Sequence, residues 1–230
     1  MKYKILFLLI FLLSFQNLFA QGYKHPPKEI EDVLNAPAIP QTSVSPAKDK
    51  ILLLEPLRYP PITELAQPML RLAGLRINAN TNGQHRQPYF VKLTLKNISD
   101  GKETPIVLPN GAQVISPNWS ADGKYIAFGN QTPTGIELWI TETESGKAKQ
   151  LKNIKVNTVF GGFDWMPDQK SLLVNLVPTQ HDAAPAYQNL TPTAPSIQET
   201  AGKTGVVQTF QDLLKSPNDE GLFDYYATSQ

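Results

Sequence analysis

The sequence predicts an all-β fold. Three stretches share one pattern: an aromatic residue or a valine precedes a short polar segment with an aspartate, and a lysine then leads into an apolar run. These stretches are Val44–Leu54, Trp119–Phe128 and Trp165–Val174. The polar segments have the composition of tight turns, and the apolar runs have the length of strands. The turn aspartates Asp49, Asp122 and Asp168 lie 73 and 46 residues apart, and a period near 46 is typical of one four-stranded propeller blade.

The composition agrees with many short strands and narrows the classes of function. The 230 residues include 20 prolines and 14 glycines, which favour turns. A formal net charge of +1 predicts neither a nucleic-acid partner nor an anionic membrane surface. The chain has no cysteine, which removes disulfides, thiol catalysis, zinc–thiolate sites and iron–sulfur ligation together. We expect no cofactor and no metal site.

Residues 1–20 have the features of a secretory signal peptide. Lys2 and Lys4 give a positive start, and the apolar core that follows, Ile5–Leu13, is too short to span a bilayer, which takes about 20 residues. Cleavage is expected between Ala20 and Gln21, which predicts a periplasmic or secreted protein with no membrane contact after cleavage. Leu18 is larger than the small residue preferred at its position, so a retained N-terminal anchor is the alternative.

Residues 21–40 form a polar lead-in with one short helix predicted within Pro26–Leu34, because proline starts it and acids fill its first turn. Residues 41–230 are expected to form the N-terminal part of a β-propeller, with two blades and part of a third. The first blade contains strands within Ser43–Glu55, Tyr89–Lys96 and Thr104–Leu108. An insertion interrupts it, with a weak helix predicted over Ile62–Leu70.

The second blade is predicted over Gln113–Asn153, with four strands joined by short turns. Those strands are expected at Gln113–Trp119, Lys124–Gly129, Glu137–Glu142 and Ala148–Leu151. The third unit has strands within Thr158–Asp164 and Ser171–Val177, followed by a long loop, Pro178–Gly205.

Near the end of the chain, Val206–Thr209 is expected to resume order, Gln211–Leu214 to form a short helix, and Ser216 to cap a second helix with proline at its first position. The third unit then lacks two strands at Gln230. We therefore expect an N-terminal piece of a longer protein, with a partial propeller that is incomplete at its C-terminus and leaves Thr228–Gln230 as an unpaired edge. Exposed edges invite association, so the isolated chain is expected to self-associate.

Three segments resemble the prolyl oligopeptidase family of serine peptidases, and its glutamyl endopeptidase branch in particular. They are Leu65-Ala66 with Leu72–Ile77, then Trp119–Phe128 with Leu138-Trp139-Ile140, and Thr209–Lys215 with Leu222–Gln230. The resemblance implies a propeller that gates peptide access to an α/β-hydrolase domain with a Ser-Asp-His triad, and a whole protein that cleaves after glutamate. That C-terminal hydrolase domain is absent here, since no serine sits in G-x-S-x-G, so no catalytic residue is assigned.

The alternative is a non-enzymatic periplasmic propeller that binds another protein, similar to the Tol-system propeller. Both hypotheses give Asp49, Asp122, Gly123 and Asp168 a structural role in blade turns, because each turn offers only one acid and a calcium site needs several oxygen ligands.

Other candidate site residues have a structural interpretation that we favour. The histidines 25, 85 and 181 lie in polar segments without an evident nucleophile partner. The tryptophans 119, 139 and 165 lie on predicted strands, where blade packing is more expected than a ligand pocket. Arg76 and Arg86 could clamp an acidic substrate side chain, and the loop Pro178–Gly205 could be a gate, but a structural ion pair and a surface insertion are the simpler interpretations.

Overall fold

The structure, a computed structural model, describes residues 24–180, 183–186, 202 and 212–230. The predicted signal peptide, its cleavage site at Ala20 and Gln21, His181, the segment 206–209 that was expected to resume order, and most of the long loop therefore lie outside the described residues. The chain divides into two compact units, 1–37 and 38–230. Throughout the described residues, no helix has the length and apolar character to cross a membrane.

The first unit contains one described helix, α2 (Lys28–Leu34), as predicted. Pro27 precedes it, and Glu29 and Glu31 lie in its first turn, where acids interact favourably with the helix dipole. The Lys28 ammonium lies 2.8 Å from the Asp32 carboxylate one turn later. None of its residues is buried.

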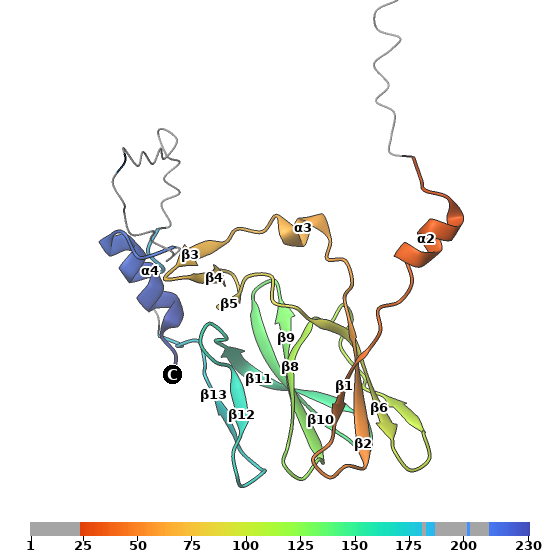
Figure 1. Ribbon diagram of the computed structural model, residues 1–230. Helices are drawn as coiled ribbons and strands as arrows, with labels where there is room; N and C mark the ends of the chain where they lie inside the picture. Colours follow the sequence, from red (N-terminus) through yellow and green to blue (C-terminus); the bar gives the residue numbers. More distant parts are fainter. Residues whose placement is uncertain (1–23, 181–182, 187–201, 203–211) are drawn as a thin grey trace, which may run out of the picture. The chain divides into compact units, whose positions relative to one another are not determined.

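The second unit is mostly β-sheet, which confirms the all-β fold class (Figure 1). Its first four-stranded antiparallel group, the first meander, consists of β1 (Gln41–Val44), β2 (Lys50–Pro56), β6 (Phe90–Asn97) and β7 (Glu103–Pro105). Pairing follows chain order, from Val44 beside Ile51 to Leu95 beside Thr104. Turn residues separate the strands: the turn that ends at Asp49 lies between β1 and β2, and Asp100-Gly101 lies between β6 and β7.

The second meander repeats this arrangement with β8 (Val114–Trp119), β9 (Tyr125–Thr132), β10 (Gly135–Glu142) and β11 (Ala148–Val156). Each strand pairs antiparallel with the next along the chain. The two meanders join in one sheet through a single residue pair, Phe90 beside Val114. A closed propeller is not seen in the described part of the chain.

Within residues 38–230, a third group of strands follows the two meanders and is called the third unit here; it begins with the hairpin β12 (Phe163–Trp165) and β13 (Leu172–Val174). Just beyond β13, Leu176 and Gln230 exchange two backbone hydrogen bonds of 3.0 and 3.1 Å. The expectation that Thr228–Gln230 forms an unpaired edge is therefore wrong. The physical reason is that the helix before it returns the chain to the side of this unit.

The insertion between β2 and β6 contains α3 (Ile62–Leu65) and a small sheet of β3 (Leu70–Leu72), β4 (Leu75–Asn78) and β5 (Gly83–Gln84). The helix expected over 62–70 is thus one turn long, because the chain turns into strand β3 at Leu70. The predicted second C-terminal helix is present as α4 (Pro217–Ala227), and the Ser216 hydroxyl caps it by accepting a hydrogen bond from the Asp219 amide at 3.2 Å. Residues 212–214 are not helical, so the helix expected there is wrong over its described part.

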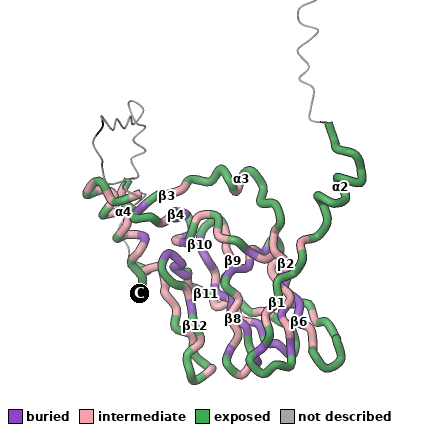
Figure 2. The backbone as a smooth tube through the Cα atoms, in the orientation of Figure 1, coloured by how far each residue is buried: buried purple, intermediate pink, exposed green. Residues whose placement is uncertain are grey.

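The second meander is buried on both faces, because side chains on a strand alternate between the faces of a sheet. On β9, Ile126 and Phe128 pack towards the first meander, and Ala127 packs towards the third unit. One core therefore lies between the first and second meanders and another between the second meander and the β12–β13 hairpin. Figure 2 shows the buried residues along these strands.

Candidate functional site

The predicted turn residues form a hydrogen-bonded turn near the start of each of the three strand groups: the first meander, the second meander and the third unit. In the first, the Ser45 hydroxyl accepts from the Asp49 and Lys50 amides at 3.2 and 3.1 Å and donates to the Asp49 carboxylate at 2.7 Å. That hydroxyl bond and the neighbouring Lys50 hold the pKa of Asp49 below its usual value. The carboxylate is thereby fixed as an acceptor within its own turn.

The second turn also contains a serine, an aspartate and a lysine, but its aspartate lies two residues after the serine instead of four. Ser120 donates to the Asp122 carboxylate at 2.7 Å, and the same carboxylate accepts from the Lys124 amide at 3.1 Å. The Ser120 bond is the main reason that the pKa of Asp122 is lowered. Gly123 takes a positive φ of 72°, which glycine adopts without strain.

Asp168 organises the third turn. Its carboxylate accepts from the amides of Lys170 and Ser171, both at 2.9 Å, and from the Ser171 hydroxyl at 2.7 Å. The hydrogen bond from the Lys170 backbone amide is the largest cause that lowers the pKa of Asp168. Asp122 and Asp168 thus accept from backbone amides of their own turns, whereas the Asp49 carboxylate accepts from the Ser45 and Lys50 side chains.

The three aspartates do not occupy equivalent positions in their turns, although the repeated sequence pattern predicted that they would. Lys48, Gly123 and Gln169 take the one left-handed position of each turn, with φ of 57°, 72° and 58°. Asp122 and Asp168 precede that position, whereas Asp49 follows it. The first turn has Ala47 where the others have aspartate, and Ser45 supplies the acceptor instead.

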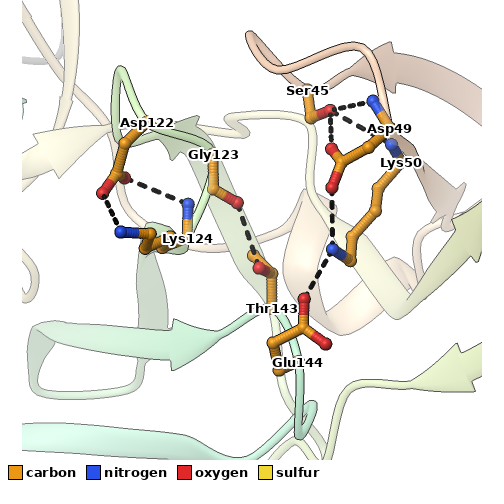
Figure 3. Close-up of polar contacts among 8 residues, drawn as sticks. All are labelled: Ser45, Asp49, Lys50, Asp122, Gly123, Lys124, Thr143 and Glu144. Carbon is orange, nitrogen blue, oxygen red and sulfur yellow. Dashed lines mark hydrogen bonds and ion pairs between the residues drawn. The ribbon is translucent and has the colours of Figure 1, made fainter.

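Polar contacts join these turns between the two meanders (Figure 3). The Lys50 ammonium, whose side chain is 11% exposed, bonds Asp49 at 2.9 Å and Glu144 of the second meander at 2.8 Å. The bond to Glu144 is the first cause of the raised pKa of Lys50. Within the second meander, the Thr143 hydroxyl donates to the Gly123 carbonyl at 3.0 Å. The network locks neighbouring turns together and leaves no free carboxylate pair for chemistry there.

Two tryptophan indoles donate a hydrogen bond to the strand group that precedes their own. The Trp119 indole N–H donates to the Ser43 hydroxyl at 3.0 Å, and the Trp165 indole N–H donates to the Asn118 carbonyl at 3.1 Å. Ser43 and Asn118 each lie two residues before the first residue of their turn. Trp139 instead donates to Glu137 of its own strand at 2.9 Å and stacks on Phe128. All three indoles therefore pack within or between units.

The described histidines lack a nucleophile partner. His25 lies 3.9 Å from the Glu31 carboxylate on the surface, and His85 contacts the Gln67 carbonyl at 3.1 Å. Over the residues that the structure describes, no group of three or more histidine or acidic side chains could hold a metal ion.

Arg76 has a structural partner. Asp212 bonds Arg71 at 3.0 Å and lies 3.6 Å from Arg76, and its carbonyl accepts from the Gly74 amide at 3.3 Å. The same region contains a small apolar core between the insertion and α4, built mainly from Leu70, Leu72, Ile77, Val159, Leu222 and Tyr226. Segments that are about 140 residues apart in the sequence thus form one cluster, which strand patterns alone could not have shown.

Asn157 is a buried polar residue that sequence reasoning missed. Its amide donates to the carbonyls of Tyr226 and Thr228 at 2.9 and 3.0 Å, and its oxygen accepts from the Val159 amide at 3.0 Å. A single asparagine in a connecting segment carries no sequence signal for this role. It fixes the end of α4 to the second meander.

Two cavities in the described part of the chain share Glu64 of the insertion in their linings. The first, about 210 Å³, is mainly apolar and includes Leu57, Leu65 and Arg86 in its lining. The second, about 420 Å³, has a polar lining that includes Asn80, Gln113 and Gln131. The Tyr89 hydroxyl donates to Glu64 at 3.0 Å, and burial is the main cause that raises the pKa of Tyr89 to about 12.

The curated proteins to which this chain is similar are endopeptidases. It is 39% identical over 224 residues to a probable glutamyl endopeptidase, chloroplastic, of Oryza sativa subsp. japonica, and 38% identical over 223 residues to one of Arabidopsis thaliana. Each match covers 91% of this chain but 24% and 23% of the relative, so the chain spans about a quarter of their length. No family model matches the chain.

Solved structures with similarity to the chain include a peptidase and a TolB protein. The acylaminoacyl peptidase of Pyrococcus horikoshii is 18% identical, with a TM-score of 0.36 over 67% of this chain and 20% of that chain. TolB of Acinetobacter baumannii is 19% identical, with a TM-score of 0.28 over 64% of this chain and 39% of that chain.

Proposed function

We propose that this chain is the N-terminal propeller portion of a serine endopeptidase of the prolyl oligopeptidase family, in its glutamyl endopeptidase branch. The observation that carries the proposal is the 39% identity to a probable glutamyl endopeptidase across 91% of the chain. A match over 91% of the chain extends well beyond the three turn repeats, so it does not depend on them alone.

The repeated geometry supports the propeller part of the proposal. Blades of a propeller stack face to face around an axis, so an inner blade buries both of its faces. The second meander does so, and the Trp119 and Trp165 indoles each donate to a residue at the corresponding position of the preceding strand group, to the Ser43 hydroxyl and the Asn118 carbonyl. The pairing of Gln230 with Leu176 begins a third strand beside β13.

In this proposal the chain has a structural and gating role. It shapes the entrance to a catalytic cavity and limits access to short or unfolded peptides. Acyl transfer, with serine as nucleophile and histidine as base, takes place on a hydrolase domain downstream. In this division the turn carboxylates of Asp122 and Asp168 have a structural role, as acceptors of backbone amides.

The rival proposal, a protein-binding propeller without enzymatic activity, explains the turn repeat equally well. It does not account for the 39% and 38% identity to probable glutamyl endopeptidases over 91% of the chain. We also propose that the mature chain is periplasmic or secreted, on the basis of Lys2, Lys4 and the apolar run that follows.

The test is to read the gene beyond codon 230 and to express its whole product. We expect an open frame with G-x-S-x-G followed by Asp and His, and cleavage after glutamate that a serine-reactive fluorophosphonate abolishes. Residues 21–230 expressed alone should not cleave the same peptides. A stop codon directly after Gln230, or hydrolysis by the 21–230 chain itself, would overturn the proposal.

A further inference from the structure

The insertion between β2 and β6 leaves and re-enters the first meander at one place. Pro56, the last residue of β2, pairs with Phe90, the first residue of β6. One residue further into the insertion, the Leu57 amide donates to the Tyr89 carbonyl at 3.2 Å. These two pairs close the base of the insertion, and we call them the near anchor.

The other end of the insertion, the small sheet of β3, β4 and β5, binds residues that follow the second meander in the sequence. The Thr158 amide, between β11 and β12, donates to the Asn82 carbonyl at 2.9 Å. A side chain at Gly83 would come within 2.8 Å of the Thr158 hydroxyl, so the backbone of the insertion lies directly against this residue. We call this end of the insertion the far anchor.

The far anchor also includes the packing of the small sheet on α4. Leu72 belongs to the buried cluster that contains Leu222 of α4, and the Asp212 carboxylate, ahead of that helix, bonds Arg71 at 3.0 Å. The backbone bonds between Gln230 and Leu176 join the residues after α4 to the third unit. In Figure 1 the insertion runs from β2 through α3 to the small sheet beside α4.

Between the two anchors, a cavity of about 420 Å³ separates part of the insertion from the second meander. Thr63 and Gln67 of the insertion line one side, and Gln131 and Thr132 of β9 line the other. The packed parts of the insertion are therefore its two ends. It connects the first meander to the third unit directly, in addition to the contacts that pass through the second meander.

We propose that the insertion is a strap that ties the third unit to the first meander and keeps the interface between the second meander and the third unit closed. The described third unit needs such support, because β12 and β13 are strands of three residues and an isolated two-stranded hairpin is marginally stable in water. Opening of that interface then requires the far anchor to release. The proposal concerns the described residues and does not rest on the peptidase assignment.

The first test follows urea unfolding in two single-tryptophan proteins, each with the other two tryptophans replaced by phenylalanine. One keeps Trp119, which bonds the first meander, and the other keeps Trp165, which bonds the second meander. Leu72→Ala weakens the far anchor, and it should lower the urea midpoint more in the Trp165 protein than in the Trp119 protein. Leu95→Ala is the matched control, because Leu95 is also 2% exposed but lies in the core between the two meanders, and it should not lower the Trp165 midpoint more than the Trp119 midpoint. Equal shifts of the two midpoints in Leu72→Ala would overturn the proposal.

The second test uses a milder change and the folded protein. Asp212→Asn keeps the shape of the side chain and removes its charge from Arg71 and Arg76. Hydrogen exchange of the Thr158 amide, whose acceptor is the Asn82 carbonyl of the strap, should become about threefold faster, since a partly exposed ion pair contributes little more than this. Asp224→Asn, an acid of α4 that bonds neither arginine, should leave this exchange rate unchanged. An unchanged Thr158 rate in Asp212→Asn would contradict the role of the far anchor.

Discussion

The bond between Trp119 and Ser43 offers a direct test of how the units are held together. The indole N–H donates to the serine hydroxyl at 3.0 Å across the interface between the first and second meanders. Trp119→Phe removes the donor and keeps an aromatic ring in the core, and Ser43→Ala removes the acceptor. If the bond stabilises the interface, the two substitutions are not additive.

The expected coupling is modest. A neutral hydrogen bond contributes about 0.5–1.5 kcal/mol to the free energy of unfolding, and Trp119 is only partly buried. Trp119→Phe alone should cost more, because it also removes part of the apolar contact with the core between the meanders. The cycle of four proteins separates this packing loss from the hydrogen bond.

The assay is urea unfolding followed by far-ultraviolet circular dichroism, since the substitution changes tryptophan fluorescence. We expect a coupling energy of about 1 kcal/mol between the two sites. Trp139→Phe is the control, because its indole bonds Glu137 on the same strand and should show no coupling to Ser43. A coupling energy of zero for Trp119 would refute the claim that this bond holds the meanders together.

Three further predictions test the rest of the described fold. Asn157→Leu leaves two carbonyls and one amide without their partner, so it should lower the free energy of unfolding by about 3 kcal/mol or more in urea titrations, and an effect below about 1 kcal/mol would contradict the role of Asn157. Leu222→Ala should cost roughly 2–5 kcal/mol, because Leu222 is 1% exposed, and a smaller loss would mean that α4 does not pack on the insertion. Asp122 and Asp168 have lowered pKa values in the folded state, so their contribution is present above the ordinary value of 3.8 and is lost as the pH falls through the folded pKa. The melting temperature should therefore drop more steeply below pH 3.8 in the parent chain than in Asp168→Asn.

The strands were predictable because their signals are local. Apolar alternation and the turn residues around Asp122-Gly123 specify a hairpin without reference to the rest of the chain. The four strands observed in the second meander overlap those expected, but three are longer: β9 extends to Thr132, β10 begins at Gly135 and β11 extends to Val156. The cap at Ser216 was predictable for the same reason, since a cap depends on a few consecutive residues.

The remaining features depend on contacts between distant segments. The offset of Asp49 by two positions became visible only from the left-handed residues, because serine at position 45 replaces the acceptor that aspartate supplies in the other turns. The partner of Arg76 is Asp212, and the partner of Glu64 is Tyr89. Sequence periodicity does not specify such pairs. The sequence alone therefore left two interpretations of Arg76: a clamp on an acidic substrate side chain, or a structural ion pair.

The β12–β13 hairpin has one face that packs on the second meander and one opposite face. The face of β12 and β13 that holds Trp165 and Leu172 packs on the second meander, so Asp164 and Leu173 lie on the opposite face, directly beside each other in the pairing register. Leu173 is 64% exposed, although leucine at an equivalent position of the second meander would be covered by the next unit. Within the described residues, this face of the hairpin holds one exposed leucine beside an aspartate. If the proposed propeller continues, its next blade would pack against Leu173 as the third unit packs against Ala127 of the second meander.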